Sequence, residues 1–353
     1  MSLDPQIREQ LQKNTEKCTQ EAARLLIEEE NHEAAKEKLA YVKIARQLLG
    51  GEESPHHLYL ASFIAFLCLL LVGFAVTVHI PSTEVGLEIE AETVSFQLNR
   101  DWSNNVRLAA NSIYINNLER LVVSGLGIDS TPAAIELTAK KLTLPVLGLT
   151  AESQVEIEIQ GEKLSVYVKN GEFRGEIYAA NAHLILENES ETIAKEIPDG
   201  IPETLEFVSL KQTLDPVKVE LDVLGKWYLS NLQVNNLYFA KENFPGSGHF
   251  VSSIQHGQVK LLETGQSVAL NKGEQLSILA KNSKRLEISR KGERLGIVFY
   301  GTVSSIKAGP DGFERNLAPT WLEYLYHQKR LTLFWSSVVF LWGLFWSARN
   351  FHS

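Results

Sequence analysis

The chain has 353 residues, 44% of them hydrophobic, and 43 acidic against 34 basic residues give it a formal net charge of −9 at pH 7. A surface with this charge repels the phosphates of nucleic acid, so the composition excludes a nucleic-acid-binding protein. The two cysteines, Cys18 and Cys68, lie in the first fifth of the chain. The long region after them therefore cannot hold disulfides and depends on a hydrophobic core.

Residues 1–51 predict a helical hairpin. Their apolar residues recur at helical spacing in two stripes, which Gly50 and Gly51 terminate. A lone hairpin buries little apolar surface, so we expect it to pair with copies of itself or with a cytoplasmic protein partner. A solvated stalk without a partner is the alternative. The residues expected to carry the interaction are Ile7, Leu11, Cys18, Leu25, Leu39, Val42 and Leu49.

Two apolar runs predict membrane-spanning helices at residues 58–80 and 331–348. The first has His79 as its only ionisable side chain, and the second has none. At 1.5 Å per residue they would extend about 34 Å and about 27 Å, close to the ~30 Å thickness of a hydrocarbon core. The first begins too far from the N-terminus for a cleaved signal peptide and is interpreted as an uncleaved signal anchor.

Charges beside the first run predict the orientation. Lys43 and Arg46 precede it, whereas residues 81–95 contain neither lysine nor arginine. The excess of basic residues on the cytoplasmic side places the N-terminus in the cytoplasm and residues 81–328 outside it, in a bacterial inner membrane. Membrane lipids are therefore among the expected partners.

The region between the two runs alternates apolar and polar residues, which indicates a large, antiparallel, all-β sandwich or roll. Glycine-containing turns separate the predicted strands, and Asn170-Gly171 predicts a type I′ hairpin turn, in which both central residues have positive φ. Prolines and a glycine near residue 200 suggest two β modules, residues 81–200 and 201–318.

Residues 320–330 predict a helical lead-in at a membrane interface. Thr320 and Glu323 have the spacing of a capping box. The aromatic residues Trp321, Tyr324 and Tyr326 are expected to anchor the lead-in among lipid headgroups.

Small residues in the last apolar run, Ser336, Gly343 and Ser347, fall near one helix face and suggest a helix-packing surface.

The residues that could form a catalytic or metal-binding site match the known patterns poorly. His249 and His256 lack the cysteine or carboxylate partners of a metal site, and His56-His57 is interpreted as interfacial polarity. Ser304 and Lys307 match S-x-x-K, but in strand-like sequence rather than on a helix. We therefore expect no enzyme, no metal and no cofactor.

Residues 254–276, IQHGQVKLLETGQSVALNKGEQL, resemble the core of FecR-type periplasmic domains, in which short strands are joined at glycines. The resemblance extends over about 35 residues, to about residue 290. It implies a regulator whose cytoplasmic segment contacts a transcription factor, whose single helix crosses the membrane, and whose β domain senses an outer-membrane partner. The second apolar run and the short N-terminal region depart from that pattern.

The leading functional prediction is a non-enzymatic, membrane-anchored scaffold or assembly subunit that links a cytoplasmic partner to envelope components. Two alternatives remain at this point. One is a FecR-like signalling regulator, and the other is an oligomeric two-span channel. Homo-oligomerisation or membership of a membrane complex is expected, and nucleic acid is not a partner.

Overall fold

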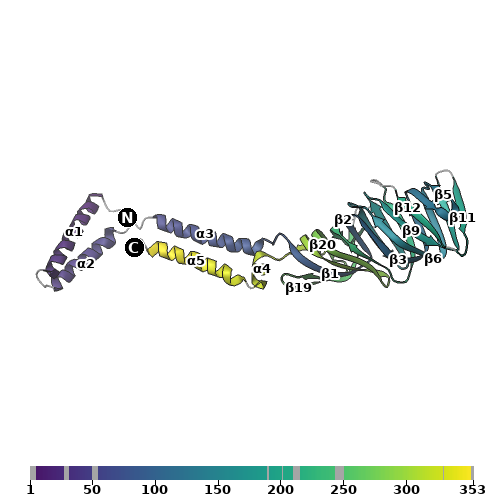
Figure 1. Cartoon of the computed structure of the whole chain (residues 1–353). Helices are drawn as coiled ribbons and strands as arrows, with labels where there is room; N and C mark the ends of the chain where they lie inside the picture. The colour runs from purple at the N-terminus through teal and green to yellow at the C-terminus, as the bar shows by residue number, and fades with distance from the viewer. Residues whose placement is uncertain are drawn as a thin grey trace. The chain divides into compact units, whose positions relative to one another are not determined.

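The computed structural model describes residues 5–27, 32–49, 55–188, 191–200, 202–209, 215–242, 250–328 and 330–350. The chain divides into two compact units. The helical unit comprises Met1–Gly73 and Thr332–Ser353, and the β unit comprises Phe74–Leu331 (Figure 1).

The first two helices, α1 (Pro5–Ile27) and α2 (His32–Leu49), pack against each other. Small side chains fill their interface, because Thr15, Ala22, Ala35 and Ala45 are all buried. Small residues allow two helix backbones to approach closely. The stripes of apolar residues thus form helices at the predicted places.

The prediction of two membrane-spanning helices is wrong. Within the described residues, no helix combines the length and the apolar character needed to cross a bilayer. Helix α3 (Pro55–Thr77) ends before the apolar run does, and Val78 to Ile80 continue as extended chain. In α5 (Leu331–Asn350), serines interrupt the apolar run. The described fold is instead an antiparallel β protein with five helices, so the fold class and the membrane and transmembrane descriptions are corrected.

The β unit is built from short and long strands. Its first half contains β1 (Thr83–Ala91), β2 (Thr93–Leu98), β3 (Trp102–Asn116), β4 (Leu118–Val123), β5 (Ile128–Ser130), β6 (Ala134–Leu149), β7 (Gln154–Gln160), β8 (Lys163–Lys169), β9 (Phe173–Ala179), β10 (Ala182–Glu187) and β11 (Thr192–Ile197). Its second half contains β12 (Glu203–Ser209), β13 (Val217–Leu224), β14 (Tyr228–Leu232), β15 (Val234–Tyr238), β16 (Ala240–Glu242), β17 (Phe250–Ser252), β18 (Ile254–Leu261), β19 (Gln266–Leu270), β20 (Gln275–Lys291), β21 (Arg294–Gly309) and β22 (Arg315–Asn316). A short 3-10 helix, Ser124–Leu126, follows β4.

All the strand pairings among the described residues are antiparallel. One series of neighbours runs β19, β18, β1, β21, β20, β15, β2, β7, β8, β13, β3 and β6. From β6 the pairing branches to β10 and β11 on one side and to β9, β12, β4 and β5 on the other. Figure 1 shows β1, β19 and β20 at the α4 end of this unit and β5 and β11 at the opposite end.

Irregularities in the long strands let one strand serve two neighbours. The register of β6 with β3 shifts twice, and β6 pairs with β10 over residues 134–139 and with β9 over residues 143–149. Because a bulge bends a strand and increases its twist, the two stretches can face different partners.

The core of the β unit follows the alternation in the sequence. In β1 and β13, for example, every second side chain is buried and the intervening ones are more exposed. The prediction of an antiparallel, all-β region is therefore confirmed.

Strands on the two sides of residue 200 pair with each other. β12 and β13 follow that position, yet they pair with β4, β9, β3 and β8, which precede it. In the other direction, β1 and β2 pair with β18 and β15. Residues 74–331 consequently form one compact unit.

Two glycines adopt the positive φ that a two-residue hairpin turn needs. Gly161 (φ 63°) lies in the two-residue turn between β7 and β8, and Gly292 (φ 70°) lies in the turn between β20 and β21. The prediction of a type I′ hairpin turn at Asn170-Gly171 is wrong. Asn170 has φ 59°, but Gly171 has no positive φ, and β8 and β9 do not pair with each other.

The two ends of the β unit are joined by a small antiparallel bridge. His79 faces Thr320, the Ile80 backbone N–H donates to Pro319 O at 2.9 Å, and the Trp321 N–H donates to Val78 O at 3.0 Å. Helix α4 (Trp321–His327) begins directly after this bridge. Its predicted capping box is confirmed, because the Glu323 N–H donates to Thr320 Oγ1 and the Thr320 N–H donates to the Glu323 carboxylate.

Candidate binding groove

The predicted interaction stripe lies partly on the surface of α1 and α2. Ile7 and Leu39 are exposed, Leu11, Cys18 and Leu25 are half-buried, and Val42 is buried between the helices. The side chain of Leu49 is outside the described residues. Two further apolar side chains, Tyr41 and Ile44, are also exposed on α2 although neither was in the predicted stripe.

The remaining predicted surface residues lie on α5 and α4. Ser336, Gly343 and Ser347 are all exposed on α5, and a methyl group placed on Gly343 would meet no atom within 4 Å. On α4, the rings of Trp321 and Tyr324 make an edge-to-face contact with centroids 6.1 Å apart, while Tyr326 is exposed.

Metal and catalytic candidates do not converge on a site. Within the described parts of the chain, no group of three or more histidine, cysteine, aspartate or glutamate side chains could hold a metal ion. His249 falls outside the described residues. His256 lies on β18 with its Nε2 3.3 Å from Glu90, and Ser304 and Lys307 lie on β21, an extended strand.

Residues 254–276, for which the sequence predicts a likeness to FecR-type domains, form β18, β19 and the start of β20. The first two pair as a hairpin, whose loop contains Gly265 at φ 69°. β20 pairs with β14, β15 and β21 instead of β19.

A hollow of about 300 Å³ lies across four adjacent strands, β15, β2, β7 and β8. We call it the tyrosine groove. Buried Phe96 and Val155 belong to the core beneath it. Its other side chains are Ser95, Gln97, Gln154, Glu156, Tyr167, Lys169, Asn236 and Tyr238.

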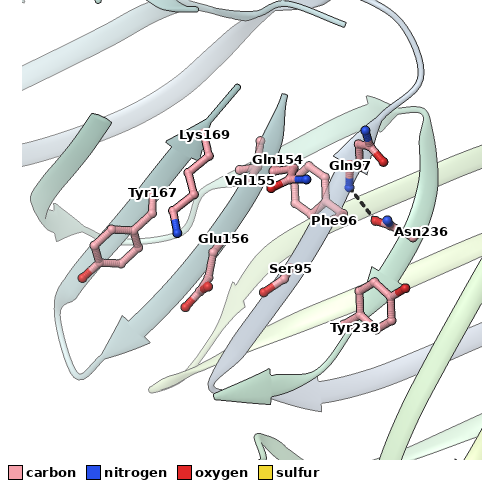
Figure 2. A pocket seen from close by; sticks show the side chains of 10 residues that line it. All are labelled: Ser95, Phe96, Gln97, Gln154, Val155, Glu156, Tyr167, Lys169, Asn236 and Tyr238. Atoms are coloured by element: carbon pink, nitrogen blue, oxygen red, sulfur yellow. Dashed lines mark hydrogen bonds between the residues drawn. The ribbon is translucent and has the colours of Figure 1, made fainter. Parts of the chain in front are cut away.

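The strand register arranges these side chains in two parallel rows. In one row, Tyr238 pairs with Ser95, Ser95 with Glu156, and Glu156 with Tyr167. Figure 2 shows the two tyrosines on opposite sides of the view, with Ser95 and Glu156 between them.

The second row follows two residues along each strand. Asn236 pairs with Gln97, Gln97 with Gln154, and Gln154 with Lys169. Side chains two apart on a strand point to the same face of the sheet, so the two rows form one surface.

A register shift in β15 positions one wall of the groove. Between Val234 and Asn236 the pairing with β2 shifts by a residue, and the Gln97 backbone N–H donates to Asn236 Oδ1 at 2.8 Å (Figure 2). A backbone N–H left without a ladder partner is costly, so this contact holds the amide of Asn236 in place. The Gln97 side chain donates in turn to the carboxylate of Glu152 at 2.9 Å.

Carboxylates gather beyond the first row of the groove. Lys241 Nζ lies 2.6 Å from Glu158, which is largely buried. This hydrogen bond raises the pKa of Lys241 above its ordinary value, against the effect of burial, and the charges of Glu92 and Glu156 add to it. Lys241 therefore carries a full positive charge beside three carboxylates.

No family model matches this chain, and no curated protein matches it.

The tyrosine groove was missed at the level of sequence. Its residues come from four separate segments, and each segment resembles an ordinary solvent-facing strand edge. Only the strand register brings Tyr167 and Tyr238 to the two ends of one row. Had the strand pairing been known, the sequence would have predicted the groove.

Proposed function

We propose that this protein is a non-enzymatic scaffold. In this proposal α1 and α2 bind a protein partner, and the β unit binds a second component. The sequence contains no G-x-S-x-G, P-loop or H-E-x-x-H pattern, which favours a binding role over a catalytic one. The channel alternative is dropped, because it required two membrane spans.

The observation that supports this proposal most directly is the set of apolar side chains exposed on α1 and α2. Ile44 is 58% exposed, and Ile7, Leu39 and Tyr41 are each exposed by 45% or more. Apolar side chains gathered on a surface mark sites of protein–protein interaction, and tyrosine is enriched among the residues that dominate binding energy.

Charge does not select the partner. Residues 1–51 contain eight lysines and arginines and nine aspartates and glutamates, so they are close to neutral. The exposed apolar side chains, and not the net charge, support a protein partner. A FecR-like regulator would use the same two parts, and that resemblance remains a prediction.

The test uses the full chain with three variants. Leu39→Glu combined with Ile44→Glu places charge on the exposed face, and deletion of residues 1–51 removes it altogether. Leu262→Glu is the matched control, because Leu262 is an exposed leucine of the β unit. Affinity capture followed by mass spectrometry should identify a partner that the wild type and Leu262→Glu retain and the other two variants lose.

Retention of the same partner after deletion of residues 1–51 would contradict the proposal. Equal loss in Leu262→Glu would do so as well, because the binding surface would then lie on the β unit.

A further inference from the structure

The tyrosine groove combines features that a plain sheet surface does not require. Its first row has a large aromatic side chain at each end and the small Ser95 inside. Neighbouring strands lie about 4.8 Å apart, so three strand spacings place the two aromatic positions roughly 14 Å apart. The result is a hollow with an aromatic residue at either end.

Both tyrosines are accessible from solvent. Tyr238 is 42% exposed and Tyr167 is half-buried. A phenol ring offers a flat apolar face together with a polar tip, and it immobilises few rotatable bonds when it contacts a ligand. The two positions therefore suit a ligand that has apolar faces and polar edges.

The floor and the far wall supply hydrogen-bonding groups of both kinds. The amides of Gln97, Gln154 and Asn236 each contain a donor and an acceptor, the carboxylate of Glu156 accepts, and the ammonium of Lys169 donates. A ligand rich in hydroxyl groups matches this mixture, because each hydroxyl both donates and accepts.

The position of the groove on a sheet face argues against an added peptide strand. Within the ladders of β15, β2, β7 and β8, the backbone groups already pair with neighbouring strands. Peptides that extend a sheet need an unpaired edge. The volume of about 300 Å³ is instead at the lower end of the range for small-molecule sites.

The charges in the groove disfavour a strongly ionic ligand. Glu156 and Lys169 have opposite signs and come from the adjacent strands β7 and β8. A phosphate or sulfate group would gain from one and be repelled by the other. A neutral ligand avoids this conflict.

We propose that the tyrosine groove binds a neutral, extended saccharide of the flat, β-1,4-linked type. The apolar faces of its sugar rings lie against Tyr167 and Tyr238, and its hydroxyl groups bond to Gln97, Gln154 and Glu156. A flat ribbon of linked rings fits a shallow hollow that crosses four strands. This inference rests on the proposed binding role of the β unit and names the class of its ligand.

Calorimetric titration of the full-length chain with cellotetraose and with chitotetraose tests the proposal. We expect saturable binding of at least one of the two, and at least tenfold weaker binding in Tyr167→Ala and in Tyr238→Ala. Tyr228→Ala is the matched control, since Tyr228 is a 57% exposed tyrosine on β14 that does not line the groove. Thermal unfolding followed by circular dichroism verifies that each variant is folded.

Absence of binding to both saccharides at millimolar concentration would overturn the inference, as would equal weakening by Tyr228→Ala. If a groove variant fails to fold, Gln154→Ala replaces it, because Gln154 is exposed and its loss should also weaken binding. The partner capture described above uses variants of α1 and α2, so its failure and the failure of saccharide binding are separate results.

Discussion

The fold requires glycine at position 171, because there is no space there for a side chain. A methyl group at this position would lie 1.7 Å from Ser153 Oγ and 2.6 Å from Ser153 Cβ. Ser153 is fully buried, and its hydroxyl donates to Thr150 O at 2.6 Å, so it has no room to withdraw. Glycine is therefore needed here for close approach and not for a type I′ turn.

We predict that Gly171→Ala destabilises the β unit by about 1–3 kcal/mol, the usual cost of overpacking a filled interior. Urea unfolding monitored by tryptophan fluorescence measures the change. Gly86→Ala is the control, because a methyl group there meets no atom within 4 Å. Equal stability of Gly171→Ala and Gly86→Ala would contradict the packing described around Ser153.

Glu90 is a largely buried carboxylate surrounded by three basic side chains. It forms an ion pair with Lys291, and it lies 3.3 Å from His256 Nε2 and 3.9 Å from Arg294. The hydrogen bond from Lys291 holds the pKa of Glu90 below its ordinary value, although burial acts in the opposite direction. The same contact raises the pKa of Lys291.

A carboxylate with a lowered pKa stabilises the folded state above its unfolded pKa of about 4.3, and this contribution is lost as the pH falls through the lower folded value. Lysine with a raised pKa behaves in the opposite sense, and its contribution is lost as the pH rises above about 10.4. We predict that Glu90→Gln is less stable than the wild type at pH 7, and that the difference shrinks below pH ~4.

Urea unfolding at pH 7 and at pH 3 measures this difference. Glu293→Gln is the control, since Glu293 is exposed in the turn between β20 and β21. A wild-type to Glu90→Gln difference that is the same at both pH values would refute the assigned role of the charge.

At the scale of the element, α1 and α2 depend on small side chains between them. Ala35 is completely buried in this interface, whereas Ala40 is exposed on the same helix. Alanine and leucine have similar helix propensities, so exchanging one for the other mainly changes packing.

We predict that Ala35→Leu destabilises the pairing of α1 with α2 by about 1–3 kcal/mol, because the added side chain has to separate the helices. Ala40→Leu should have little effect. Hydrogen exchange of residues 5–49 in the full-length chain measures the local opening. If both variants exchange like the wild type, α1 and α2 are not packed as described.

At the scale of the whole molecule, backbone contacts hold the first and last segments of the β unit together. The contacts around His79 and Thr320 make these two residues a non-hydrogen-bonded antiparallel pair. The Cα atoms of such pairs are about 4.5 Å apart, within the range that a disulfide accepts.

We predict that His79→Cys with Thr320→Cys forms a disulfide spontaneously, in a chain whose Cys18 and Cys68 are replaced by serine. Closing so long a loop should stabilise the β unit by on the order of 4 kcal/mol in the chain-entropy account. Non-reducing electrophoresis detects the closed form, and thermal unfolding with and without reductant measures its effect. A double variant that stays reduced under air would show that the two ends do not meet.

Several elements could be predicted from the sequence because their signals are local. The alternation in β1 and β13, the stripes in α1 and α2, the glycine turns at Gly161 and Gly292, and the capping box of α4 each depend on residues a few positions apart. A run of apolar residues is less informative. It does not reveal that α3 ends at Thr77, where Val78 begins an extended segment that pairs with the far end of the β unit.

The amino-acid sequence alone determined that the middle of the chain is an antiparallel sheet and that its beginning is helical, because side-chain periodicity is a property of neighbouring residues. The tertiary structure alone decided which strands pair. It joined residues 79 and 320, left Asn170-Gly171 without a hairpin, and aligned Tyr238, Ser95, Glu156 and Tyr167 in one row. Such pairings depend on the register between segments far apart in the chain, and a shift of one residue would turn every groove side chain to the opposite face of the sheet.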